Sequence, residues 1–199
     1  MLIKEDMLIK FGAKKVKYKK NEVLFTENTI PLYYFQIKNG SVKLINHHKE
    51  GREFIHNLLS KGDSIGETFL FSEYPYLVNA MVVEDSIVFE LERTAFHKLL
   101  KTHPDILFQL YQYTAEKMRY RYKMNNLIFN NPTGRILTVL NDLKEQQQQQ
   151  QQQQYSCEVP YTRQQIASLT GLRVETVVRN VKHLEKEGIL KIIKGKIFY

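Results

Sequence analysis

Three polar side chains near the C-terminus have the types and the spacing that are needed to read the edges of DNA bases. Glu175, Arg179 and Lys182 recur at i, i+4 and i+7, so an α-helix would carry them on one face. An arginine can donate two hydrogen bonds to guanine O6 and N7 in the major groove, and a glutamate can accept one from cytosine N4. The alternative is an exposed ion pair between Glu175 and Arg179, which would stabilise the helix by only a few tenths of a kcal/mol.

The surrounding stretch, Thr162–Leu184, predicts two short helices joined by a tight turn, and the second helix carries these side chains. Thr162 begins the first helix as an N-cap, and Gln165 completes a capping box. Gly171 supplies the turn. Apolar residues with helical period predict the buried face of the second helix: Val177, Val181 and Leu184. This helix-turn-helix pattern favours DNA reading over a surface ion pair.

A short hairpin after the second helix predicts the wing of a winged helix. Its strands cover Ile189–Ile193 and Ile197–Tyr199, with a turn at Lys194-Gly195-Lys196. Lysines at the turn could bind phosphates, which adds affinity without sequence information. The residues predicted to contact DNA are Thr162, Arg163, Arg173, Glu175, Thr176, Arg179, Lys182, Lys194 and Lys196.

Residues 16–92 predict a small antiparallel β-roll. Stretches rich in β-branched and aromatic residues alternate with turn signals. The predicted turns are Asn39-Gly40, Lys49-Glu50-Gly51 and Lys61-Gly62-Asp63. The predicted strands are Leu32–Ile37, Ser41–Ile45, Glu53–Leu59 and Met81–Leu91. We expect a short helix on each side of the roll, at Met1–Phe11 and at Thr94–Thr102.

The pattern at Asp105–Asn130 predicts a long helix with two apolar faces, each of which must pack against a partner. We expect the roll to cover one face and the same helix of a second subunit to cover the other. A single helix buried in the core of one chain is the alternative. The residues predicted at the dimer interface are Leu110, Tyr113, Tyr120, Met124 and Leu127. The second apolar stripe consists of Leu107, Tyr111, Met118, Tyr122 and Phe129.

Asn131-Pro132-Thr133-Gly134 predicts a hinge, with Thr133 capping a helix from Arg135 to about Glu145. Gln146–Gln154 is a low-complexity run, which we expect to be a solvent-exposed insertion. The predicted fold class is therefore α+β, with an N-terminal β-roll at 1–103, a dimerisation helix and hinge at 104–131, and a winged helix-turn-helix domain at 132–199.

The composition limits the partners and the compartment. Lys and Arg number 29 against 21 Asp and Glu, and this net charge of +8 suits a polyanionic partner. Cys157 is the only cysteine, which excludes an intrachain disulfide and a multi-cysteine metal site. The chain has neither a signal peptide nor an apolar run of about 20 residues, so we expect a cytoplasmic protein without a membrane partner. Near the N-terminus we interpret a group of lysines as a solvated face: Lys14, Lys15, Lys17, Lys19 and Lys20.

In this order, the β-roll, long helix, hinge and winged helix-turn-helix resemble the Crp/Fnr family of transcription regulators, typified by the cyclic AMP receptor protein. The matching segments are Gly62–Glu67, Thr133-Gly134-Arg135-Ile136 and Thr162–Leu184, so the resemblance covers nearly the whole chain. It implies a cyclic-nucleotide-binding-like roll (a double-stranded jelly roll) and a homodimer bound to a palindromic site. The implied partners are double-stranded DNA and RNA polymerase.

The recognition helix departs from the family pattern at one position. The family typically has Arg-Glu-Thr-Val-x-Arg, whereas this chain has Val174 in place of the first arginine. The resemblance therefore implies a half-site that keeps the G·C pair read by Glu175 and Arg179. The half-site should differ from that of its relatives where the missing arginine would read.

The resemblance also implies an effector site in the roll, where the match is weaker. Gly66 and Glu67 match, but Val78-Asn79-Ala80 replaces the motif whose arginine neutralises the phosphate, and Tyr120-Arg121-Tyr122 replaces the polar pair that contacts adenine. A buried phosphate without its arginine would cost several kcal/mol. We expect an unknown effector, or none, rather than cyclic AMP, and no required cofactor. The candidate effector contacts are Gly66, Glu67, Val78, Asn79, Tyr120 and Arg121, of which Arg121 could supply a replacement charge.

Two other classes of function are alternatives. A cupin-like enzyme would bind a catalytic metal through residues such as His47, His48, Glu53 and His56. Adjacent strand residues point to opposite faces, however, so the two neighbouring histidines cannot enter one site. A ligand-sensing module that acts only through protein partners would not need the winged helix. We therefore predict no enzymatic activity and no metal site.

Overall fold

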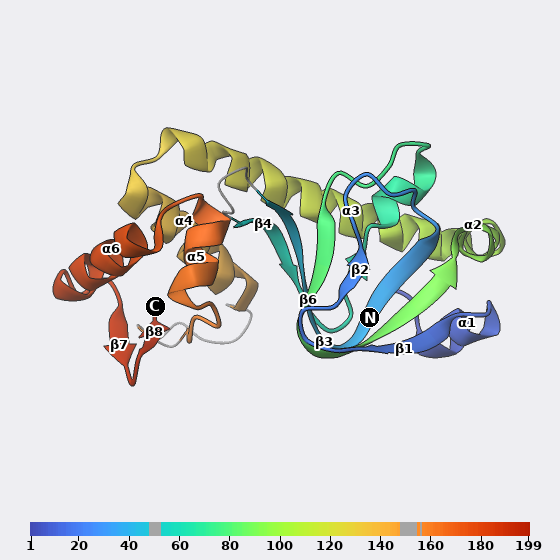
Figure 1. The fold of residues 1–199 in the computed structure, drawn as a ribbon, viewed down its shortest axis with the longest axis horizontal. Helices are drawn as coiled ribbons and strands as arrows, with labels where there is room; N and C mark the ends of the chain where they lie inside the picture. Colours follow the sequence, from blue (N-terminus) through green and yellow to red (C-terminus); the bar gives the residue numbers. More distant parts are fainter. Residues whose placement is uncertain (48–52, 148–154, 156) are drawn as a thin grey trace. The chain divides into compact units, whose positions relative to one another are not determined.

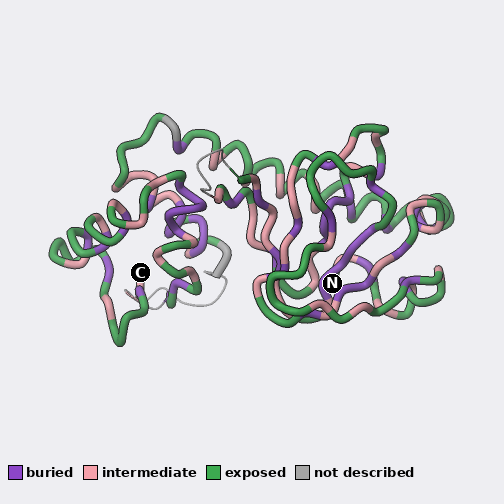
Figure 2. The backbone as a smooth tube through the Cα atoms, viewed as in Figure 1, coloured by how far each residue is buried: buried purple, intermediate pink, exposed green. Residues whose placement is uncertain are grey.

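The computed structural model describes residues 1–47, 53–147, 155 and 157–199 (Figure 1). This chain divides into two compact units, Met1–Met118 and Arg119–Tyr199. Figure 2 shows buried segments in the strands of the first unit and in the helices of the second. The turn predicted at Lys49-Glu50-Gly51 and most of the glutamine run, residues 148–154, lie outside the described residues.

The first unit is built on an antiparallel sheet with the strand order β1-β6-β3-β4. Two shorter strands, β2 and β5, pair with β6 and β3. The strands are β1 (Lys14–Tyr18), β2 (Val23–Phe25), β3 (Tyr33–His47), β4 (Glu53–Leu59), β5 (Ser64–Ile65) and β6 (Asn79–Glu92). The predicted antiparallel roll is confirmed, as is the turn before β5, where Asp63 N donates to Ser60 O over 3.0 Å.

Strand β3 corrects one prediction. Asn39-Gly40 is not a hairpin turn, because β3 continues through both residues and joins the two strands predicted on either side. Gly40 has a φ of +94°, and the pairing of β3 with β6 shifts register around it. A Cβ atom at Gly40 would lie 2.1 Å from the hydroxyl oxygen of Ser86 on β6. The glycine therefore serves a β-bulge where two backbones pass closely.

Two apolar clusters lie on opposite faces of the sheet. Val88 and Phe89 are neighbours on β6, so their side chains point to opposite faces, and each belongs to a different cluster. Phe25 and Phe35 join Val88 inside the roll. The cluster around Phe89 also contains Leu8 from the first helix. The roll interior is thus closed by the sheet itself, while helices cover the other cluster.

Three helices contribute to that outer cluster. They are α1 (Glu5–Lys10), which is shorter than predicted, α2 (Arg93–Thr102) and α3 (Pro104–Asn125), and a 3-10 turn, η2 (Asn126–Phe129), follows α3. Figure 1 shows α1 and α2 near one end of the sheet. Pro104 begins α3, which is favourable because the first helical residue needs no N–H donor. None of the described helices is long and apolar enough to cross a membrane.

The residues predicted at the dimer interface differ in exposure. Leu110 on α3 and Leu127 on η2 are 3% and 5% exposed, so the chain itself covers their side chains, whereas Tyr120 and Met124 are half-buried. Leu110 belongs to the outer cluster of the first unit. The Tyr113 hydroxyl donates to Asp63 Oδ1 over 3.0 Å, which fastens α3 to the roll. The second apolar stripe is the exposed one, and its neighbour Phe108 extends it: Leu107, Phe108, Tyr111, Met118 and Tyr122.

The second unit is a small helical domain with a two-stranded wing. Its elements are α4 (Pro132–Gln147), α5 (Arg163–Thr170), α6 (Val174–Lys186), β7 (Lys191–Ile193) and β8 (Lys196–Phe198). Figure 1 shows the three helices packed together, with the hairpin projecting from them. Thr133 does not cap α4 as predicted. Asn131 Oδ1 accepts from Gly134 N over 2.8 Å instead, while the Thr133 hydroxyl donates to Asn180 on α6.

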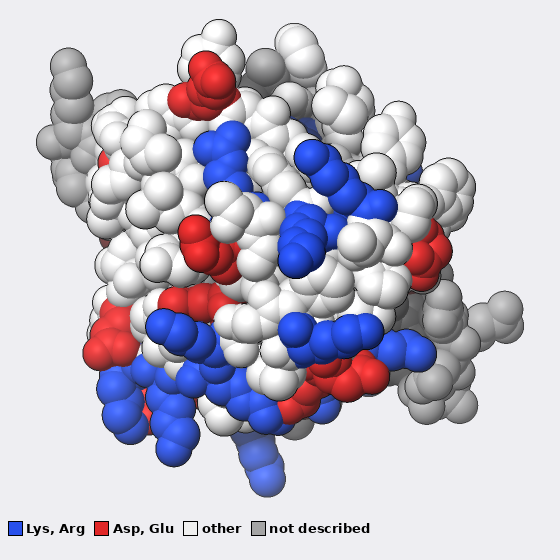
Figure 3. Space-filling model, turned by 90° about the vertical axis from the view of Figure 1, so that its right-hand side faces the viewer, with Lys and Arg blue, Asp and Glu red and all other residues white. Residues whose placement is uncertain are grey.

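The lysines near the N-terminus lie on an exposed face. Lys15 pairs with Glu5, and Lys19 pairs with Asp85 at 2.8 Å. Figure 3 shows one face of the molecule on which basic side chains gather in the lower part, with acidic side chains among them. All five lysines of the group are exposed, and two of them pair with acidic side chains, which agrees with the interpretation of a solvated face.

Candidate nucleic-acid interface

The helix-turn-helix is fixed by local interactions that the sequence predicts. The Thr162 hydroxyl accepts from Gln165 N over 3.1 Å, and Thr162 N donates to Gln165 Oε1 over 2.8 Å, which confirms the capping box. Gly171 ends α5 with a φ of +66°, a conformation that glycine adopts without strain. These contacts set where α5 begins and where it ends.

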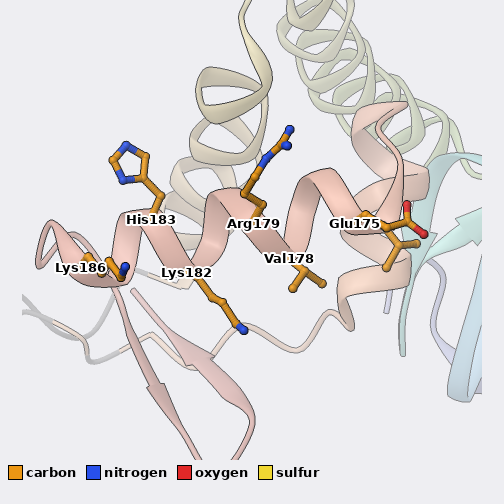
Figure 4. Close-up of a pocket in the computed structure, with 7 residues that line it drawn as sticks. Glu175, Val178, Arg179, Lys182, His183 and Lys186 are labelled. Atoms are coloured by element: carbon orange, nitrogen blue, oxygen red, sulfur yellow. The ribbon is translucent and has the colours of Figure 1, made fainter.

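Helix α6 is buried on one face and open on the other. Val177, Val181 and Leu184 are at most 1% exposed and confirm the predicted stripe. The opposite face lines an open groove of ≈ 640 Å³ (Figure 4). The lining residues form two i, i+4 rows on α6: Glu175, Arg179 and His183 in one, and Val174, Val178, Lys182 and Lys186 in the other.

The polar residues of this face are available to a ligand. Within the described chain, the side chains of Glu175, Arg179 and Lys182 form no hydrogen bond or ion pair. Glu175 and Arg179 are four residues apart but are not within ion-pair distance, so the ion-pair alternative does not describe the structure. The Arg179 guanidinium therefore keeps its five N–H donors for an external acceptor.

Other predicted DNA contacts are arranged differently. Arg163 donates to Gly195 O at the wing turn, and Lys196 donates to Glu158 Oε1 over 2.5 Å. Lys194 is exposed at the tip of the wing, where both central residues of the turn have positive φ. Arg173 is the exposed N-cap of α6, Thr162 is also exposed, and Thr176 is half-buried. Contacts between these residues and DNA stay a prediction.

Several residues that shape this face were missed in the sequence. Val178, His183 and Lys186 lie in the groove, and the i, i+4 spacing from Val174 and Lys182 could have found two of them. Arg135 also positions the helices. Its guanidinium donates to Asn130 O over 3.1 Å and to Thr170 O over 3.4 Å, so it links the start of α4 to the C-terminal end of α5.

In the roll, Gly66 and Glu67 are enclosed by the chain itself. Gly66 has a φ of +69° and precedes a short 3-10 helix, η1 (Glu67–Phe71). A Cβ atom at Gly66 would lie 3.1 Å from Tyr76 and 3.2 Å from Phe25. Glu67 is buried and accepts from the Ser64 hydroxyl over 3.0 Å, and this burial raises the pKa of its carboxyl.

The residues in place of the family's phosphate-binding motif also have internal partners. Asn79 Oδ1 accepts from Glu27 N over 3.0 Å, and its amide nitrogen donates to Ile45 O over 3.4 Å. Val78 packs against the apolar interior of the roll. Tyr76 stacks on Phe25, with ring centroids 3.6 Å apart. Aromatic rings thus fill the interior beside Gly66, and the side chains of Glu67 and Asn79 form hydrogen bonds within the roll.

The other two predicted effector contacts belong to the second unit. Tyr120 is half-buried, and burial together with nearby Tyr161 and Asp142 raises the pKa of its hydroxyl. Arg121 is exposed. The role of both residues in effector binding stays a prediction.

Comparison with known proteins agrees with this arrangement. A family model described as "Cyclic nucleotide-binding domain" matches residues 15–103, and one described as "Crp-like helix-turn-helix domain" matches residues 134–198. The cAMP-activated global transcriptional regulator CRP of Salmonella typhimurium is 33% identical over 168 residues, which cover 82% of this chain and 78% of that protein. The chain belongs to the Crp/Fnr family of transcription regulators.

Other Crp/Fnr proteins extend the similarity. The cAMP-activated global transcriptional regulator Vfr of Pseudomonas aeruginosa is 30% identical over 184 residues, covering 89% of this chain and 84% of Vfr. The fold is shared with the c-di-GMP responsive regulator CLP of Xanthomonas campestris, with a TM-score of 0.79, 20% identity and 98% of both chains covered. It is also shared with FixK2 of Bradyrhizobium japonicum, with a TM-score of 0.75, 23% identity and coverage of 94% and 91%.

Membership of the Crp/Fnr family makes this protein a DNA-binding transcription regulator with an α+β fold. Its relatives are regulators, which are not enzymes. Among the described residues, no three His, Cys, Asp or Glu side chains lie where they could hold a metal ion. The cupin-like alternative drew on His47, Glu53 and His56, which form no such group, and on His48, which lies outside the described residues.

Proposed function

We propose that this regulator binds a palindromic DNA site as a homodimer, with one α6 in each of two successive major grooves. The observation that carries the proposal is the open face of α6, where Glu175, Arg179 and Lys182 have no partner within the described chain. A two-fold reader of this type places its half-sites about one helical turn, ~34 Å, apart. Glu175 and Arg179 would read a G·C pair in each half-site.

A second copy of the chain is the partner proposed for α3. The exposed stripe on this helix includes Phe108 and Tyr111, which are 62% and 71% exposed. Apolar area of this kind is covered in a stable protein, and a two-fold reader needs two copies. RNA polymerase is a further proposed partner, which rests on the family resemblance alone. The proposed domain boundaries are 1–103, 104–131 and 132–199.

We propose further that cyclic AMP is not the effector, although CRP and Vfr are named as cAMP-activated. The sequence has no arginine between Arg52 and Arg93 to neutralise a phosphate. Asn79 is bonded within the roll, and the buried Glu67 would lie beside a second negative charge. A different ligand, if the roll binds one, would act by favouring one orientation of the DNA-binding domains about Asn131–Gly134.

Binding-site selection from random duplex DNA tests these proposals, with the full chain in the presence and in the absence of cyclic AMP. We expect an inverted repeat with one G·C pair in each half-site, enriched equally in both conditions. Analytical ultracentrifugation of the complex should give two chains per site. Failure to enrich an inverted repeat would contradict the two-fold reading, whereas enrichment only with cyclic AMP would contradict the proposal about the effector.

A further inference from the structure

The groove on α6 has an apolar row beside its polar row. Figure 4 shows Arg179 and His183 extending to one side of the helix, and Val178 and Lys182 to the other. Val178 is the one large apolar residue of α6 that stays exposed, at 37%. Val174 precedes it by one turn but is half-buried and packs against the core of the second unit. Val178 is therefore the apolar side chain that this face offers to a ligand.

An exposed valine has a cost in this position. Valine loses side-chain freedom in a helix and is a weaker helix former than alanine or lysine. Single exposed apolar residues are common on protein surfaces and carry no meaning alone. Val178, however, is bordered by Glu175 at i−3, Arg179 at i+1 and Lys182 at i+4, all of which line the same groove. A duplex that fills this groove would therefore meet Val178 as well as the polar row.

We propose that Val178 reads the C5-methyl group of a thymine close to the G·C pair that Glu175 and Arg179 read. This inference rests on the proposed placement of α6 in the major groove. Thymine is the base that presents a methyl group there, and apolar side chains recognise it by contact. Neighbouring side chains on a helix surface are about 5–6 Å apart, and base pairs are stacked about 3.4 Å apart. The thymine therefore lies one or two base pairs from the G·C pair.

Valine also discriminates against the other bases at this position. It has neither a donor nor an acceptor, so an adenine or guanine N7 placed against it would lose a water partner and gain none, and cytosine has no methyl group to bury there. The contact thus favours thymine by burying its methyl group and disfavours the polar edges. Val178 is a specificity residue in addition to Glu175 and Arg179.

The test replaces thymine by uracil, which lacks only the C5-methyl group. In the site obtained by selection, each dT is changed to dU in turn, and the affinity of the full chain is measured by fluorescence anisotropy. We expect one position in each half-site to lose about fourfold in affinity, as for the burial of one methyl-sized group. Val178→Ala should bind the dT and dU versions of that position equally.

A matched control is Ile189→Ala. Ile189 is 38% exposed and follows α6 without lining the groove, so its variant should keep the fourfold preference for dT. Circular dichroism should show both variants folded, because each removes an exposed side chain.

The outcomes separate this inference from the proposed function. An enriched repeat that depends on Arg179, but in which no dT responds to the loss of its methyl group, would overturn the role of Val178 alone. A preference for dT that survives in Val178→Ala would overturn it as well. Selection that enriches no site would overturn both the inference and the proposed function.

Discussion

The open face of α6 and the β-roll differ in whether their polar side chains have hydrogen-bond partners within the chain. On α6, Glu175 and Arg179 have no hydrogen bond or ion pair within the described chain. In the roll, Glu67 accepts from Ser64, and Asn79 is bonded to the backbone on both sides of its amide. A binding surface keeps its donors and acceptors for the ligand, whereas groups already bonded within the fold contribute to stability. The difference supports the proposal that the open face of α6 binds a partner, and it shows that Glu67 and Asn79 are bonded within the roll.

The largest expected effect is on the free energy of unfolding, and it compares a glycine in the roll with a glycine in the wing. In Gly40→Ala the added Cβ would collide with Ser86 and occupy a strained φ, so we expect a loss of about 3 kcal/mol in the free energy of unfolding. Gly195→Ala is the matched control, because Gly195 also has a positive φ but no atom within 4 Å of the new Cβ. Its loss should be about 1 kcal/mol. Equal losses in urea unfolding would contradict the difference in packing.

A pair of variants tests the comparison directly. Arg179→Ala should weaken DNA binding by about 1–3 kcal/mol and relax the preference at one base pair, without changing the free energy of unfolding. Asn79→Ala should do the reverse, because it leaves Glu27 N and Ile45 O without a partner. We expect it to lower the stability of the roll by about 1–2 kcal/mol and to leave DNA affinity unchanged.

Both quantities are measured for both variants, by anisotropy on the selected site and by urea unfolding. A uniform loss of affinity across all sequences for Arg179→Ala would make Arg179 a phosphate contact rather than a base reader. Weaker DNA binding by Asn79→Ala would show that a change in the roll alters the DNA affinity of α6.

Tyr76 offers a smaller effect of the opposite sign. Its hydroxyl is buried and has no hydrogen-bond partner among the residues that the structure describes, while its ring stacks on Phe25. Tyr76→Phe keeps the ring and removes the unsatisfied group, so we expect a gain of about 1 kcal/mol in the free energy of unfolding. Thermal unfolding of the variant beside the wild type measures it. A loss of stability would mean that the hydroxyl has a partner in solution, such as a ligand of the roll.

Cyclic AMP should have no effect on the roll. A ligand present at 100 times its dissociation constant stabilises a protein by about 2.7 kcal/mol, which a thermal melt detects. We expect no shift in the unfolding midpoint of this chain, and a clear shift for the Salmonella CRP measured alongside as the positive control. A shift of similar size in both proteins would mean that the roll can open to admit the nucleotide.

The sequence predicted a region well where the interactions that fix its structure join residues close together in the chain. In α5 and α6 the capping box, Gly171 and the periodic valines act within a few residues, so the sequence alone places both helices. In β3 the Asn39-Gly40 pair has the same local signal as a turn. What makes it a bulge is Ser86, a contact across 45 or more residues of chain that no local pattern contains.

The errors on α3 and α4 have similar causes. A helix with two apolar faces does not tell which face its own chain will cover, and here the face with Leu110 is the covered one. Asn131 and Thr133 can both cap a helix. Pro132 decides between them, because proline is favoured at the first helical position and so makes Asn131 the cap.

The hydrogen bond from Arg163 to Gly195 O orders the wing before the domain binds DNA. It joins the first turn of α5 to the tip of the wing, so these two parts hold their shape together before any contact is made. A loop that is ordered in advance loses little entropy on binding. We therefore expect the wing to add to DNA affinity through rigidity as well as through the charge of Lys194. Arg163 would then contribute to DNA binding without contacting a phosphate.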